Sequence, residues 1–176
     1  MKIRIITGLI IGIALAIWLL LYSCNPEVEM TSITRPYQEY DYTILEPPPL
    51  PAAGSGSPSS LDIATVNEIN DVREEEGLES LDFDLSLGAV AKVRAEESSE
   101  KFSHTRPDGT QWYTVNETIQ FGENLAYGYD TAEDVVDAWL DSPTHRDLLL
   151  DNEFTSCGIG SYEKDGTTYM ACEFGY

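Results

Sequence analysis

The residues best suited to chemistry are the two histidines of the chain and a carboxylate between them. His104 lies in a Phe-Ser-His-Thr-Arg-Pro-Asp-Gly run, Glu123 in Gly-Glu-Asn-Leu-Ala, and His145 in Ser-Pro-Thr-His-Arg. Imidazole changes charge or binds a metal near neutral pH more readily than any other side chain. These residues are far apart in the sequence, so they can act together only if the fold brings them to one hollow.

Two imidazoles and one carboxylate match the ligand set of a divalent metal with open coordination positions, and zinc is the first candidate. Two other interpretations use the same side chains. They can hydrogen-bond one another and hold loops in place, or an imidazole can transfer protons in catalysis. Nucleophilic catalysis would also need an activated hydroxyl or thiol, and nothing in the sequence marks one.

Ser142 and Arg146 flank His145 in sequence and are therefore expected at the same cleft. Ser142 precedes a proline, which is typical of a helix cap followed by the first turn. Arg146 is expected to bridge loops or to bind carbonyl groups.

The chain is strongly acidic. Its 176 residues include 31 acidic and 10 basic ones, and the formal net charge is -21. Such a charge repels phosphate backbones, so it argues against nucleic-acid binding, and it attracts cations. A solvated surface suited to a salty or extracellular medium explains the charge without any ligand.

Residues 1–24 are predicted to be a signal or a membrane anchor. Two basic residues precede an apolar run from Ile5 to Tyr22, which reaches the lower end of the length that spans a bilayer. The positive-inside rule places the rest of the chain outside the cell. The sequence ending at Cys24 resembles a bacterial lipobox, so a lipid-modified Cys24 and an uncleaved helix both stay open. Either one tethers the chain to the outer face of the cell membrane.

Residues 25–60 are predicted to be a disordered linker, because proline, glycine and serine recur there without a helical or strand period. Residues 61–176 are predicted to form one folded domain.

Capping residues mark the helices of this domain. One helix is expected from Leu61 to Gly77, a second after Asp84, and a third after Thr131. In the second helix the apolar residues are expected to face inward, while Arg94 and its charged neighbours face water.

The chain is predicted to end in a β-hairpin around Glu163-Lys-Asp-Gly166. If all four residues form the loop, Cys157 stands opposite Cys172, and a cross-strand disulfide is expected in an extracellular protein. If Asp165-Gly166 alone forms the turn, the two cysteines are diagonal and the bond is strained. The alternative is two free cysteines packed as small apolar residues.

Together these motifs resemble the CAP superfamily, the SCP domain shared by cysteine-rich secretory, antigen 5 and pathogenesis-related-1 proteins, in its short prokaryotic form. The matching residues are Asn67, Arg73, Asp84, Leu87, Ala91, Ala95, His104–Gly109, Gly122–Ala126, Trp139, Ser142–Arg146 and Phe174–Gly175. The resemblance covers about residues 61–176 and implies an α+β fold, an α-β-α sandwich with a cleft over the sheet.

Family members line that cleft with two histidines and two acids. The resemblance implies that His104, Glu123 and His145 are three of these four. Ser142 occupies the position of the second acid, and Asp141 is adjacent but out of register.

Two functions follow as hypotheses, and the sequence leaves open whether the chain is an enzyme. The first is a membrane-tethered extracellular CAP domain that holds a small apolar, peptide or glycan ligand in its His104–Glu123–His145 cleft. The second is a metal-dependent hydrolase that acts on extracellular peptide or cell-wall material. A purely structural role at the cell envelope is a third interpretation.

Overall fold

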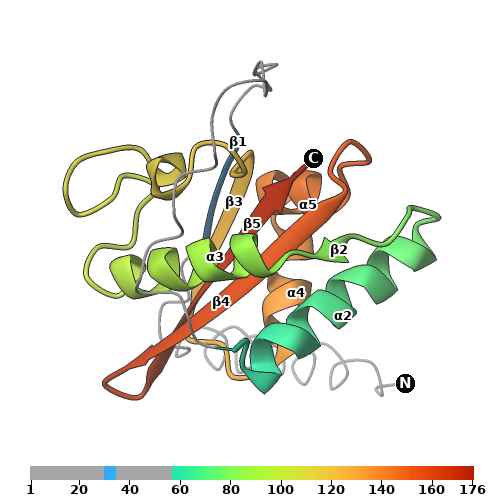
Figure 1. Cartoon of the computed structure of the whole chain (residues 1–176). Helices are drawn as coiled ribbons and strands as arrows, with labels where there is room; N and C mark the ends of the chain where they lie inside the picture. The colour runs from blue at the N-terminus through green and yellow to red at the C-terminus, as the bar shows by residue number, and fades with distance from the viewer. Residues whose placement is uncertain (1–29, 35–56) are drawn as a thin grey trace, which may run out of the picture.

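The computed structural model describes residues 30–34 and 57–176 (Figure 1). This part of the chain is a mixed α+β fold, as predicted. Its elements, in chain order, are β1 (Met30–Thr34), α2 (Ser60–Glu75), β2 (Asp82–Phe83), α3 (Leu85–Ser98), the 3-10 helix η2 (Trp112–Val115), β3 (Gly122–Tyr127), α4 (Ala132–Asp141), α5 (Pro143–Leu149), β4 (Ser156–Lys164) and β5 (Thr167–Gly175).

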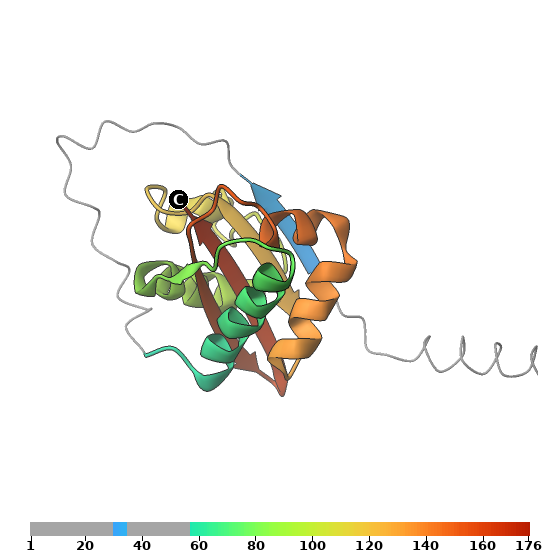
Figure 2. The same ribbon diagram turned by 90° about the vertical axis from the view of Figure 1, so that its right-hand side faces the viewer.

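A five-stranded sheet in the order β1-β3-β5-β4-β2 forms the middle layer. Its strand pairs are antiparallel except β2 with β4. Helix α3 packs on one face of the sheet, and α2, α4 and α5 pack on the other (Figure 2). The larger apolar cluster lies on the α2, α4 and α5 side, and a smaller one lies beneath α3.

Two glycines of β4 allow α3 to pack directly on the sheet. A Cβ atom at Gly158 would overlap the backbone of α3 at Leu87 and Gly88, and one at Gly160 would overlap it at Ala91 and Lys92. Only glycine permits so close an approach of two backbones. The position of α3 is therefore fixed by the absence of two side chains.

Local capping follows the predictions. Ser59 and Asp62 form a reciprocal capping box at the start of α2. The Asp84 side chain accepts hydrogen bonds from the first backbone N–H groups of α3, and Thr131 accepts one from Asp134 in α4. The predicted helix starts after Asp84 and Thr131 are confirmed, and the helix expected from Leu61 begins one residue earlier, at Ser60.

The hairpin turns through two residues. Asp165 and Gly166 have φ values of 53° and 78°, which suit the left-handed positions of a tight hairpin turn. Cys157 consequently lies opposite Phe174, not opposite Cys172, so the register predicted from a four-residue loop is wrong.

The two cysteines are buried free thiols, so the predicted disulfide is absent from this structure. Burial raises the pKa of the Cys172 thiol well above its ordinary value, and a hydrogen bond with Cys157 adds to the effect.

Part of the predicted linker belongs to the sheet. Strand β1 pairs antiparallel with β3 at the edge of the sheet, from Met30 opposite Ala126 to Thr34 opposite Gly122. The prediction of a disordered segment over 25–60 is therefore wrong at 30–34. The strand was missed because five residues give too short an alternation, while their backbone pairing depends on a distant partner.

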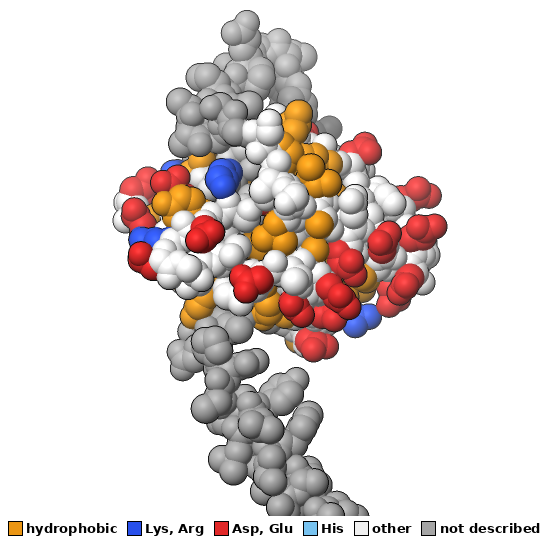
Figure 3. Space-filling model, turned by 90° about the horizontal axis from the view of Figure 1, so that it is seen from below, with side chains coloured by type: hydrophobic (Ala, Val, Ile, Leu, Met, Phe, Trp, Pro, Cys, Tyr) orange, Lys and Arg blue, Asp and Glu red, His pale blue; other side chains and the backbone are white. Residues whose placement is uncertain are grey.

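The predicted anchor at 1–24, with Cys24, lies outside the described residues. Among the helices that the structure describes, none has the length and apolar character needed to cross a membrane. Acidic side chains outnumber basic ones on the face shown in Figure 3, in agreement with the acidic composition of the chain.

Candidate functional site

Glu123 is the centre of a buried charged cluster under α3. Its side chain points from β3 toward that helix, where Arg94 binds it from Nε to Oε2 at 2.7 Å. His104 Nδ1 lies 2.6 Å from Oε1 of the same carboxylate. The side chains of Arg94 and Glu123 have no exposed surface, and His104 is 16% exposed. The predicted contact between His104 and Glu123 is therefore formed, with Arg94 as an unpredicted third member.

Arg94 connects this pair to the loop that carries His104. Its Nη1 donates to Glu97 at 2.6 Å, and its Nη2 donates to the carbonyl oxygen of Ser103 at 2.8 Å. Arg106, on the same loop, binds the other side of Glu97 at 2.7 Å. The loop is thus attached to α3 by alternating basic and acidic groups, which fix the ring of His104 against Glu123.

The electrostatics of the cluster favour a charged Arg94–Glu123 pair. Burial alone would raise the pKa of Glu123, but the hydrogen bond from His104 and the charge of Arg94 bring that pKa below its usual value. Burial alone would likewise lower the pKa of Arg94, but the Glu123 carboxylate raises it. Mutual stabilisation of the ionised forms is expected where a buried ion pair has hydrogen bonds on both sides.

A second buried acid, Glu173, lies opposite Glu123 in the β3–β5 register. Burial raises the pKa of Glu173 well above its ordinary value, and the negative charge of Glu123 adds to the effect. Gln120 donates a hydrogen bond of 3.0 Å to Glu173 Oε2. These influences favour a protonated Glu173 beside an ionised Glu123.

His145 does not join this cluster. Successive residues of a strand point to opposite faces, so Glu123 faces α3 while Asn124 faces the other layer. The Asn124 side chain donates a hydrogen bond of 3.2 Å to the backbone carbonyl of His145 on α5. His145 is 3% exposed and lies on the α5 side of the sheet, so the sheet separates it from His104. The single hollow predicted for His104, Glu123 and His145 is therefore wrong with respect to His145.

Ser142 and Arg146 also lie on the α5 side. Ser142 is the N-cap of α5, where its carbonyl accepts a hydrogen bond from the Arg146 backbone. The Arg146 side chain lies 3.3 Å from Glu76 and is about half exposed, which makes it a surface bridge between α5 and the end of α2. Both residues thus have the local structural roles predicted for them, away from the Glu123 cluster.

The three ligands predicted for zinc are not grouped together in this structure. Within residues 30–34 and 57–176, no three His, Cys, Asp or Glu side chains are grouped so that they could hold a metal ion. Glu123 is already bound by Arg94, whose positive charge would repel a cation. The buried Nε2 of His104 has no hydrogen-bond partner among the described residues, so this atom alone keeps an open ligand position.

Sequence reasoning missed Arg94, although the periodicity of α3 contains it. The buried positions of the helix are Leu87, Val90, Ala91, Arg94, Ala95 and Ser98. They follow the three- and four-residue steps of one helix face. The prediction that Arg94 faces water is wrong because the helix buries this charge against Glu123. A basic residue on an otherwise apolar stripe could have indicated a buried acidic partner.

Comparison with known proteins agrees with the fold. The model of the family described as "CAP: Cysteine-rich secretory protein family" matches residues 66–174. This match spans more than half of the chain and contains Arg94, His104, Glu123 and His145. The chain belongs to the CAP, or cysteine-rich secretory protein, family.

Among individual relatives, the uncharacterized protein YkwD of Bacillus subtilis is 31% identical over 114 residues, which cover 61% of this chain and 44% of YkwD. The uncharacterized membrane protein YlbC of the same bacterium is 34% identical over 98 residues, 52% of this chain and 28% of YlbC. The matched part therefore spans less than half the length of either relative. An outer surface protein of Borrelia burgdorferi has a similar solved structure, with a TM-score of 0.53 and 29% identity over 62% of this chain and 87% of that one.

Proposed function

We propose that this chain is a CAP domain held at the cell membrane by its N-terminal segment, on the extracellular side, where it binds a small apolar, peptide or glycan ligand. The apolar run before Cys24 supports the tether. Two relatives carry matching names, one a membrane protein and one an outer surface protein. The acidic composition also suits an extracellular medium.

One observation favours a binding function over a catalytic one: the side chains of the Glu123 cluster are bonded to one another. Both oxygens of Glu123 are engaged, by Arg94 and by His104. Among the described residues, the side chain of His104 bonds Glu123 and no hydroxyl or thiol group, and both thiols of the domain lie on the opposite face of the sheet. Nucleophilic catalysis needs such a group beside its base. The cluster is therefore better suited to hold α3 and its loop rigid around a binding surface.

Native mass spectrometry of the full-length chain, extracted in mild detergent from the membranes of the cells that make it, tests this function. A binding module is expected to carry a non-covalent adduct above the mass of the chain itself, which is 19.6 kDa when the N-terminal segment is uncleaved. Mild collisional activation should remove that adduct and leave any acyl group on Cys24. A chain that stays free of adducts after incubation with membrane and cell-wall extracts would contradict the proposal.

The alternative is a metal-dependent hydrolase, and one observation favours it. Metal-binding histidines commonly use their second nitrogen to bond a carboxylate. His104 has this arrangement, with Nδ1 on Glu123 and Nε2 without a partner among the described residues. Calorimetric titration of the full-length chain with zinc separates the two functions. The hydrolase predicts zinc binding that His104→Ala abolishes and that His145→Ala, on the other face, leaves intact.

A further inference from the structure

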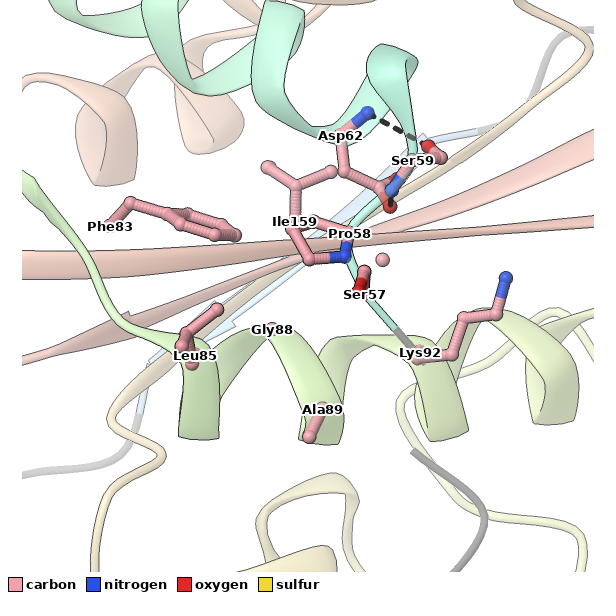
Figure 4. Close-up of a pocket in the computed structure, with 11 residues that line it drawn as sticks. Ser57, Pro58, Ser59, Asp62, Phe83, Leu85, Gly88, Ala89, Lys92 and Ile159 are labelled. Carbon is pink, nitrogen blue, oxygen red and sulfur yellow. Dashed lines mark hydrogen bonds between the residues drawn. The ribbon is translucent and has the colours of Figure 1, made fainter. Parts of the chain in front are cut away.

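A hollow of about 190 Å³ lies between the start of α2 and the first half of α3, on the side of β4 (Figure 4). It is separate from the Glu123 cluster. Its lining residues are Ser57, Pro58, Ser59, Asp62, Phe83, Leu85, Gly88, Ala89, Lys92, Ile159 and Gly160.

The walls of this hollow are mainly apolar. Phe83 and Ile159 lie across from Leu85 and Ala89 in the close-up, and Pro58 also lines the hollow (Figure 4). Leu85 is 68% exposed, so its side chain lies at the open rim of the hollow. An apolar cavity of about 150 Å³ is enough to hold benzene. The hollow is therefore large enough for the apolar body of a small molecule.

One polar atom of the lining has no partner. The Asp62 side chain is almost fully buried, with 3% of the residue exposed. Its Oδ2 accepts the hydrogen bond from the Ser59 backbone that completes the capping box. Its Oδ1 has no hydrogen-bond donor in the part of the chain that the structure describes. Since buried acceptors normally have donors, this oxygen is an open position for a donor from a ligand.

The positive charge at the other end of the hollow belongs to Lys92, which already has partners within the domain. Lys92 Nζ donates to the carbonyl oxygen of Ser161 and lies 5.9 Å from the centre of the Tyr162 ring. Its ammonium group therefore points at β4, while the field of a chain with a net charge of -21 attracts cations. The open charge in the hollow is negative.

We propose that this hollow binds a small apolar molecule that bears a protonated amine, with the amine donating to Asp62 Oδ1 and the apolar body packing between Phe83, Leu85 and Ile159. The inference rests on the proposed binding function and supplies the ligand class for it. A primary ammonium group fits because it offers hydrogen-bond donors and a charge opposite to that of Asp62.

Three probes with the same ring and different head groups test the ligand class: benzylamine, benzyl alcohol and benzoate. Each is titrated into the isotope-labelled full-length chain in detergent micelles, and binding is followed by amide and methyl NMR shifts. Benzylamine should shift the signals of Leu85, Gly88 and Ile159, and it should bind about tenfold or more tightly than the other two probes. Equal affinities, or shifts confined to other parts of the domain, would overturn the proposal.

The substitution Asp62→Asn tests the oxygen itself. The amide oxygen can still accept from Ser59, which preserves the capping box, while the amide nitrogen replaces Oδ1 with a donor. Benzylamine affinity should fall about tenfold or more. Asp71→Asn, on an exposed position of the same helix, is the matched control and should leave the affinity unchanged. Ala89→Leu, which fills the hollow, should abolish binding of every probe.

Together, these experiments distinguish a failure of the proposed ligand site from a failure of the proposed binding function. If a ligand co-purifies equally with the wild-type and Asp62→Asn chains and benzylamine does not bind, the site assignment fails and the binding function stands. If no adduct is found in any extract and no probe binds, both fail. Unchanged benzylamine affinity in Asp62→Asn would also overturn the site.

Discussion

Replacing Arg94 by methionine is predicted to destabilise the domain strongly. The change keeps most of the length of the side chain and removes its guanidinium group. The Glu123 carboxyl would then stay fully buried without the ion pair at 2.7 Å, so it would either carry an unpaired charge or have to take up a proton. Glu97 and the Ser103 carbonyl would lose hydrogen bonds of 2.6 and 2.8 Å as well.

The expected loss follows from this burial. Removing one partner of a fully buried ion pair costs about 3–5 kcal/mol, because the other charge stays desolvated. Such a loss is a large share of the roughly 5–15 kcal/mol that stabilises an ordinary domain. His104 can offset part of it, since its ring already bonds Glu123 and its protonated form would supply a positive charge.

Urea unfolding of the full-length chain measures this loss, with tryptophan fluorescence as the signal, since Trp112 and Trp139 are buried in the folded domain. Arg146→Met is the matched control, because its ion pair with Glu76 is about half exposed and is worth about 0–1 kcal/mol. The double variant Arg94→Met/Glu123→Gln should recover part of the loss, since it removes the unpaired charge.

If Arg94→Met costs no more than Arg146→Met, the Glu123 cluster does not stabilise the domain, and the argument for its rigid, non-catalytic role fails. If the loss of unfolding free energy in the double variant equals the sum of the losses in the two single variants, the two residues act independently, and the buried pair has no coupling energy.

Three other predictions concern the sheet. Glu173→Gln should stabilise the domain at neutral pH. Because the pKa of Glu173 is raised in the folded state, the free energy of unfolding of the wild type falls by up to about 1.4 kcal/mol per pH unit between the unfolded and the folded pKa. A pH series of urea midpoints should show this slope in the wild type and not in the variant. Gly160→Ala should lower the free energy of unfolding by about 1–3 kcal/mol or more, because its Cβ meets the backbone of α3, whereas Gly88→Ala, with its nearest contact at 3.5 Å, should be tolerated. Alkylation with per-residue mass mapping should find Cys157 and Cys172 protected as free thiols in the folded chain and both labelled after unfolding without reductant; a linked pair would contradict the structure.

The helix starts were the most predictable part of the fold. Asp84, Thr131 and the Ser59–Asp62 pair act on backbone groups within three residues, so the sequence contains both partners of each interaction. The hairpin register was less predictable, since Glu163-Lys-Asp-Gly166 allows both a four-residue and a two-residue loop. Strand β1 was not predictable from its own residues, because its pairing partner, β3, follows about ninety residues later.

The candidate site was only partly predictable, because its contacts also join residues that are far apart in the sequence. The motifs singled out His104 and Glu123, which are in contact, and His145, which is not. Alternation along β3 implies that Glu123 and Asn124 point to opposite faces, but it does not say which helices cover each face. The partner of His145 therefore could not be chosen from the sequence, and Arg94 could not be matched with an acid 29 positions away.

Helix α3 contributes residues both to the hollow and to the Glu123 cluster. Its first half borders the hollow at Leu85 and Ala89, and its second half supplies Arg94 to the Glu123 cluster. The helix cannot shift at one end without moving at the other, because Gly158 and Gly160 hold its backbone directly against β4. Removal of the Glu123 cluster would thus alter the walls of the hollow as well as the stability of the fold. The buried charges of the Glu123 cluster therefore help to fix the helix that forms one wall of the hollow.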